Sequence, residues 1–114
     1  MRPHGYRLAP RAAEDLRAIL RQTLRHFGTS QYAAYVALMH RAASMVAEEP
    51  DRIGSIDRRD IAEGFRAYPV WIAARRRGAS PHILFYVREA GGIAILRILH
   101  ASMDPAAHLT PSQS

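Results

Sequence analysis

Two strand-like apolar segments stand back to back between Pro81 and Asp104, and this pair most restricts the folds open to the chain. Residues 83–87 and most of residues 93–99 are β-branched or large and apolar, as strands of a core require. Between them, Glu-Ala-Gly-Gly at residues 89–92 offers the backbone freedom of a tight turn. The pattern predicts a β-hairpin at the centre of a small sheet.

Polar residues interrupt the second of these strands. Arg97 breaks its apolar run, and His100 ends it. A charged residue in a strand that is otherwise buried needs either a partner or an exposed face. Two interpretations therefore stay open. In one, Arg97 is structural, exposed on the strand or paired with Glu63 or Glu89; in the other, it joins His100 in a surface that binds another molecule.

The N-terminal half predicts two helices joined by a short turn. After a strand candidate at residues 6–8, Pro10 suits a first helical turn and Gly28 a helix end. Apolar residues at helical spacing resume at residue 32 and continue to residue 46, and Pro50 ends this second helix. Because only residues 28–30 separate the two helices, we expect an antiparallel helical hairpin.

Charged side chains of the first helix follow their own spacing. Arg17, Arg21 and Arg25 recur at intervals of four, which predicts a stripe facing solvent. Glu14 and Asp15 are expected in the first turn, where acidic side chains complement the helix dipole.

The segment after Pro50 has the weakest periodicity. Residues 51–63 are predicted to form a loop, and residues 65–72 a strand in which Pro69 indicates a bulge or an edge position. Residues 75–81 are expected to form an exposed turn. Asp104 and Pro105 suit the N-cap and first position of a short helix that ends near residue 109.

Together these elements predict an α+β fold in one domain, residues 1–114, with flexible ends at residues 1–5 and 110–114. The order is strand, helix hairpin, three-stranded meander and short C-terminal helix. We expect both helices to pack on one face of a small, mainly antiparallel sheet, because that sheet has no other apolar layer to bury against.

Composition narrows the function classes. All sixteen basic residues are arginine and the formal net charge is +6, which favours an acidic or phosphate-bearing partner. Arginine cannot transfer protons at neutral pH, so this charge favours binding over acid–base catalysis. The sequence lacks cysteine and pairs no histidines at the spacing of a helical metal site, so we expect no metal and no cofactor. No apolar run approaches the roughly 20 residues of a membrane helix, and we expect a cytoplasmic protein.

Several segments, in their order and spacing, resemble the ParE toxins of the ParE/RelE superfamily of bacterial toxin–antitoxin systems. They are YRLAPRAAEDL, a helical hairpin ending in EEP, GFRAYPV, HILFYV and ILRILHASMDPAAHL, and they cover about residues 6–109. The resemblance implies a RelE/ParE-like fold, a ParD-like antitoxin as partner, and DNA gyrase as the target of ParE members. RelE members instead cut messenger RNA on the ribosome.

The chain departs from this family pattern in two places. Ala9 stands where the family often has a threonine that caps the first helix, which removes about 1 kcal/mol of capping. Residues 71–81 are longer than the short turn expected of a ParE, and we expect them to extend the hairpin and carry their arginines outward.

The choice between gyrase inhibition and RNA cleavage depends on the available proton-transfer groups. RelE-like nucleases use lysines, arginines and a late tyrosine, whereas this chain has no lysine and no tyrosine after Tyr86. Arg66, Arg97 and His100 could still act as phosphate clamps and an acid–base group, so a RelE-type endoribonuclease is the alternative. We favour a non-catalytic toxin that binds and inhibits gyrase, and assign no catalytic residue.

Two binding surfaces follow from this interpretation. The expected target-binding residues are Arg66, Arg97, His100, Met103 and Asp104. An apolar, acidic antitoxin peptide that folds on binding would meet the helices and the adjoining sheet edge. The expected antitoxin-binding residues are Arg17, Arg21, Arg25, Tyr32, Tyr35, Arg75 and Arg76. Direct nucleic-acid binding is not expected, because the arginine triplet at residues 75–77 has no interleaved aromatic residues.

Overall fold

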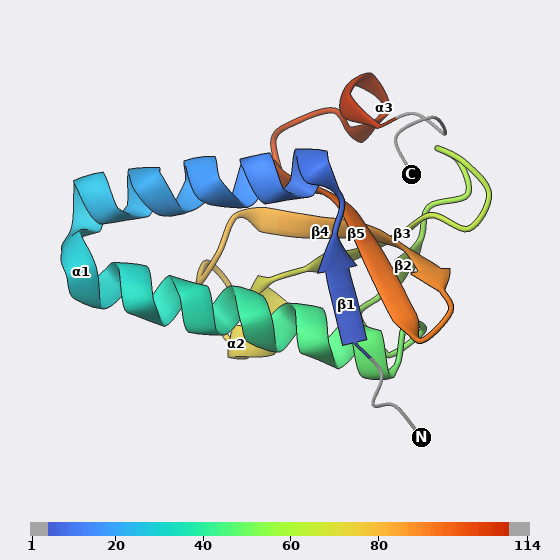
Figure 1. Cartoon of the computed structure of the whole chain (residues 1–114), viewed down its shortest axis with the longest axis horizontal. Helices are drawn as coiled ribbons and strands as arrows, with labels where there is room; N and C mark the ends of the chain where they lie inside the picture. Colours follow the sequence, from blue (N-terminus) through green and yellow to red (C-terminus); the bar gives the residue numbers. More distant parts are fainter. Residues whose placement is uncertain (1–4, 110–114) are drawn as a thin grey trace.

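The computed structural model describes residues 5–109, which form a five-stranded sheet, a long helical hairpin and two short helices (Figure 1). The strands are β1 (Gly5–Leu8), β2 (Ile56–Asp57), β3 (Arg66–Pro69), β4 (His82–Glu89) and β5 (Gly92–His100). The helices are α1 (Pro10–Glu48), α2 (Trp71–Ala74) and α3 (Pro105–His108). The α+β prediction is confirmed. Of the predicted flexible ends, Gly5 instead opens β1, and residues 1–4 and 110–114 lie outside the described residues.

Gly28 turns α1 back on itself. Its φ of 87° and ψ of −177° are not helical, and glycine adopts this backbone conformation at little cost. The two arms run antiparallel and reach beyond the end of the sheet (Figure 1). The predicted helical hairpin is therefore confirmed, and one non-helical residue is sufficient for its turn. As expected from the family comparison, no side chain caps α1 at Ala9.

The sheet has the order β1-β5-β4-β3-β2. Consecutive strands from β3 to β5 pair in antiparallel fashion, as predicted for a three-stranded meander. β2 adds a further antiparallel strand, which was not predicted, beside β3. β1 pairs with β5 in parallel, which makes the sheet mixed. The chain between β1 and β5 runs through α1 and strands β2 to β4, which is long enough to bring two parallel strands side by side.

Two predictions for the middle of the chain were wrong. The expected loop at residues 51–63 contains β2, and the expected strand at residues 65–72 ends at Pro69. Trp71–Ala74 forms α2, so residues 71–81 build a helical turn and a loop rather than a longer hairpin. Pro69 does lie at an edge, because β2 pairs only with Arg66 and Ala67 of β3.

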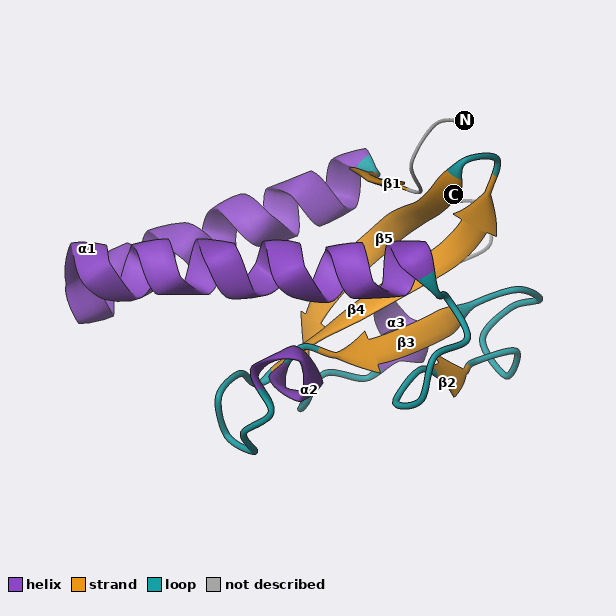
Figure 2. Ribbon diagram, turned by 90° about the horizontal axis from the view of Figure 1, so that it is seen from below, coloured by secondary structure: helices purple, strands orange, loops and turns teal. Residues whose placement is uncertain are grey.

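Apolar side chains fill both faces of the sheet. Both arms of α1 cover one face, as predicted, where Val46, Tyr68 and Ile95 are buried (Figure 2). The opposite face was expected to have no apolar layer, and this was wrong. Phe85 and Leu109 belong to a second core there, which the loop before β3 and the end of α3 close.

β5 contains a bulge in its pairing with β4. Phe85 lies opposite Arg97 and Tyr86 opposite Ile95, so Leu96 is an additional residue in β5. Ile95 packs against α1 before the bulge and Ile98 packs against it afterwards, which reverses the alternation of faces.

Among residues 5–109, none of the helices has the length and apolar character that crossing a membrane requires.

Candidate partner-binding surfaces

Arg97 is held inside the fold by Asp15 of α1. Its Nε and Nη2 donate hydrogen bonds to Asp15 Oδ2 and Oδ1 at 2.8 and 3.0 Å, and its Nη1 donates to the carbonyl oxygen of His108 at 3.0 Å. Asp15 Oδ2 also accepts from the backbone N–H of Ile98 at 2.9 Å. The side chains of Arg97 and Asp15 are only 9% and 16% exposed, and the hydrogen bonds to Asp15 raise the pKa of Arg97.

This contact joins α1, β5 and the end of α3, and it corrects two predictions. Pairing of Arg97 with Glu63 or Glu89, one of the alternatives left open by the sequence, is wrong, because its partner is Asp15. Asp15 was expected to complement the helix dipole from the first turn, but α1 begins at Pro10 and has no acidic residue in that turn. The spacing of residues in α1 could have predicted this contact. Asp15 lies on the same helix face as Ala12 and Ile19, which pack on the sheet.

Arg66 lies at the other end of the strands from His100. It donates to Ser55 Oγ at 2.8 Å and lies 3.4 Å from the carboxylate of Asp51. Arg66 is opposite Tyr86 of β4, whereas His100 is opposite His82. Four residues of strand separate these positions, which corresponds to about 13 Å. Arg66 therefore does not converge with Arg97 and His100, which line one hollow at the other end of the strands.

His82 and His100 face each other across β4 and β5, with ring centroids 5.8 Å apart. The hydroxyl of Tyr35 bonds to His82 Nδ1 at 2.7 Å and to Ser80 Oγ, which connects the second arm of α1 to the sheet. His100 Nδ1 accepts the backbone N–H of Ser102 at 3.0 Å, so a neutral His100 carries its proton on Nε2. Burial, with a smaller effect of His100, lowers the pKa of His82 to about 4. His82 is thus neutral at physiological pH.

Acidification should destabilise the protein through His82. Its folded pKa of about 4 is below the ordinary value of 6.5, so the unfolded chain binds a proton that the folded chain does not. The stabilisation is present above pH 6.5 and is lost as the pH falls toward 4. Because His82 is partly exposed, we expect a loss of about 1–2 kcal/mol. Urea unfolding between pH 4 and 7 measures it.

The informative quantity is the difference in the free energy of unfolding between the native protein and His82→Gln. The difference is needed because carboxylates also titrate in this pH range. That difference should shrink as the pH falls. A pH-independent difference for His82→Gln would contradict the assignment.

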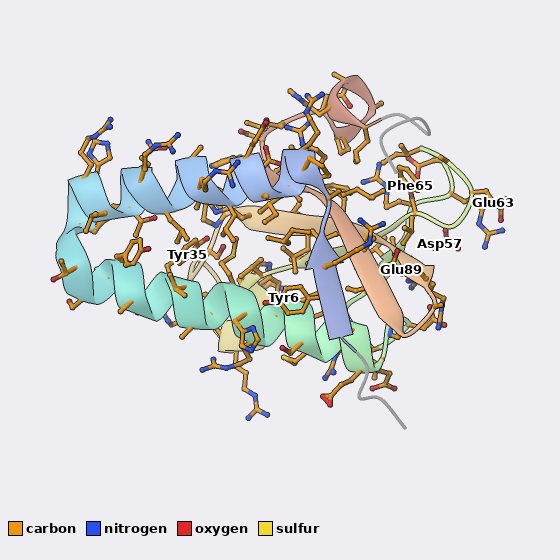
Figure 3. The ribbon with its side chains drawn as sticks, viewed as in Figure 1. Tyr6, Tyr35, Asp57, Glu63, Phe65 and Glu89 are labelled. Carbon is orange, nitrogen blue, oxygen red and sulfur yellow. The ribbon has the colours of Figure 1, made fainter. Side chains whose placement is uncertain are left out.

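A groove of about 500 Å³ opens between the tip of the helical hairpin and the start of β4. Phe27 and Pro81 contribute apolar walls, and Tyr35, His82 and His100 contribute polar ones. Phe27 is 70% exposed. Figure 3 shows Tyr35 between the two arms of α1. The same histidines also line an adjoining hollow of about 260 Å³, which extends the concave surface toward α3.

The predicted binding residues fall into distinct groups on the structure. Most of the predicted antitoxin-binding side chains are exposed, on both arms of α1 or on the loop after α2; these are Arg17, Arg21, Arg25, Tyr32, Arg75 and Arg76. Tyr35 is half-buried. Of the predicted target-binding residues, His100, Met103 and Asp104 are exposed together where β5 leads into α3. Asp104 caps α3 by accepting the N–H of Ala106 at 3.1 Å, as predicted.

This chain is similar to known proteins both in sequence and in fold. Residues 6–105 match the family model described as ParE toxin of type II toxin-antitoxin system, parDE. Toxin ParE1 of Caulobacter vibrioides is 35% identical over 104 residues, which are 91% of this chain and 96% of that toxin. A solved structure, the chromosomal ParDE TA system from P. aeruginosa, matches with a TM-score of 0.64 and 18% identity, over 84% of this chain and 94% of the other.

Proposed function

This chain belongs to the ParE toxin family of type II toxin–antitoxin systems, and from that premise we propose that it inhibits DNA gyrase by binding it, without catalysing a reaction. As a ParE toxin it has a ParD-type antitoxin as its partner. Membership of the family establishes that the chain is a toxin of this class. The geometry of its polar groups supports the proposed mechanism.

The burial of Arg97 against Asp15 is the observation that best supports a binding mechanism. Cleavage of RNA through the 2′-hydroxyl needs a base, an acid and positive charge converging on one phosphate. Here Arg97 is buried against Asp15, and Arg66 and His100 belong to opposite ends of the strands. This arrangement supports a surface that docks on a target rather than a nuclease site.

The target surface we propose is the exit from β5, at His100, Met103 and Asp104. Met103 is 45% exposed, which offers apolar area for burial against a partner. Arg97 contributes indirectly, since its bond to the carbonyl oxygen of His108 ties the end of α3 to the sheet. It is a positioning residue in this proposal, not a contact to the target.

A supercoiling assay with purified gyrase and relaxed plasmid tests the proposal. The native chain should block supercoiling or trap cleaved DNA, and Met103→Ser should weaken inhibition about tenfold by removing contact area worth roughly 1–2 kcal/mol. Ile53→Ser is the matched control, because Ile53 is 97% exposed in the loop before β2 and should be dispensable.

Full supercoiling at a large excess of the native chain would overturn the gyrase proposal. Primer extension on translated messenger RNA gives the opposing outcome. Cuts that appear with the native chain and vanish in His100→Ala would establish the RelE-type nuclease instead.

The antitoxin site we propose is the groove beside the helical hairpin together with the exposed apolar residues near its tip. Leu24, Phe27, Tyr32 and Val36 are each more than one-third exposed, which is unusual for large apolar side chains on two adjacent helical arms. An amphipathic antitoxin segment could cover them with its apolar face, while its acidic residues meet the arginines of the first arm.

A further inference from the structure

We propose that the loop after α2, at Arg75, Arg76 and Arg77, is a separate electrostatic docking site for an acidic segment of the antitoxin. This rests on the proposed antitoxin pairing and adds to it the element that recognises the partner's negative charge. We call residues 75–77 the arginine loop.

The arginine loop begins in a backbone conformation that normally favours glycine. Arg75 follows α2 with φ of 57° and ψ of 30°, and it is the one non-glycine residue with positive φ among residues 5–109. The left-handed region costs other residues about 1 kcal/mol or more. This conformation of Arg75 ends α2 and turns the chain into the loop that follows. All three arginines of the loop are exposed.

Arg77 is already ordered for binding. Its guanidinium carbon lies 5.2 Å from the ring centroid of Trp71, in a cation–π contact within the same segment. A guanidinium stacked by its face keeps its N–H edge available for a carboxylate. Because the side chain is held before the partner arrives, less conformational entropy is lost on binding.

The charges of the arginine loop are not neutralised within residues 5–109. None of its arginines takes part in an ion pair there, whereas Arg59 pairs with Asp57 and Arg88 with Asp51 at the β2 end of the molecule. The sequence has no acidic residue at positions 16–47 or 64–88, the segments that include most of α1 and the whole loop. The resulting positive field attracts an acidic partner.

The arginine loop adjoins the proposed antitoxin groove. Ala79 and Pro81, which follow the arginines in the same loop, line that groove with Phe27 and Tyr35. A segment that buries apolar side chains in the groove can therefore place its acidic residues beside the arginine loop. Nucleic acid would satisfy the charge but not the apolar wall at Phe27, so an acidic, partly apolar protein segment fits better.

Association kinetics with a purified ParD-type antitoxin test this assignment. The variant carries Arg75→Gln, Arg76→Gln and Arg77→Gln. Its matched control carries Arg7→Gln, Arg59→Gln and Arg88→Gln, which removes the same charge from arginines that already pair with carboxylates. At 50 mM salt we expect the loop variant to associate at least tenfold more slowly, with a weaker salt dependence, and the control to change less than twofold.

Equal slowing of the two variants, or no slowing of the loop variant, would overturn the arginine-loop proposal while leaving the antitoxin pairing intact. Failure of the native chain to bind the antitoxin at any salt concentration would overturn the pairing itself. A 20-base-pair DNA duplex is the third probe. Tight DNA binding that is lost only in the loop variant would assign the loop to nucleic acid and reject the acidic segment.

Discussion

Replacing Arg97 with methionine should lower the free energy of unfolding by about 3–5 kcal/mol, because the carboxylate of Asp15 would stay buried without its cationic partner. Asp15 would lose two hydrogen bonds from the guanidinium and keep only the one from Ile98. Domains of this size are stable by roughly 5–15 kcal/mol, so the loss is a large fraction of the total. Urea unfolding measures it directly.

A double-mutant cycle separates the ion pair from the packing of its side chains. Asp15→Leu combined with Arg97→Met should be less destabilised than the sum of the two single variants, since neither charge then remains buried alone. The matched control is Arg7→Met, which breaks the exposed pair with Glu89 and should lower the free energy of unfolding far less than Arg97→Met, because solvent screens that pair. Similar costs for Arg97→Met and Arg7→Met would show that the buried pair does not hold the fold together.

Arg97→Met should loosen the C-terminal end of the described residues before the rest of the protein. Arg97 Nη1 binds the carbonyl oxygen of His108, and Leu109 closes the second core. Hydrogen exchange at residues 107–109 should therefore accelerate more than exchange in β4. The proposed target surface lies next to this hydrogen-bonded end of α3. Arg97→Met should therefore inhibit gyrase more weakly than the native chain, even at temperatures where the variant is still folded.

Replacing Gly92 with alanine should destabilise the protein by about 3 kcal/mol or more, because the added Cβ has no room. It would lie 1.8 Å from the carbonyl oxygen of Gly5, a backbone atom of β1. The φ of 153° at Gly92 is also unfavourable for a residue with a side chain. To relieve the contact β1 must move away from β5, which breaks the parallel edge of the sheet.

The neighbouring glycine provides the control for this prediction. Gly91 has φ of 81°, and a Cβ added there meets nothing within 4 Å. Gly91→Ala should therefore cost only about 1 kcal/mol of backbone strain. Thermal unfolding of both variants, with hydrogen exchange at residues 6–8, measures the difference. Equal losses of stability, with β1 still protected in Gly92→Ala, would contradict the steric explanation.

Local patterns of the sequence determined much of the fold. Alternating and continuous apolar residues around Gly91 predict the β4–β5 hairpin, and helical spacing interrupted by Gly28 predicts the helical hairpin. The Asp104-Pro105 pair predicts the start of α3, whose cap is observed. Each of these depends on residues close together in the chain, where hydrogen-bond spacing and backbone preference are fixed by the residues themselves.

Tertiary structure decided which polar side chains are available to a partner. The partner of Arg97 is 82 residues away in sequence. The contact requires both the bulge at Leu96 and the parallel pairing of β1 with β5, which places the start of α1 beside β5. A bulge depends on the register between two strands, which no local pattern specifies. The sequence by itself determined that a charged residue interrupts a buried strand. Only the packing of α1 against β5 decided that this charge is satisfied inside the fold, while His100, Met103 and the arginine loop are left at the surface.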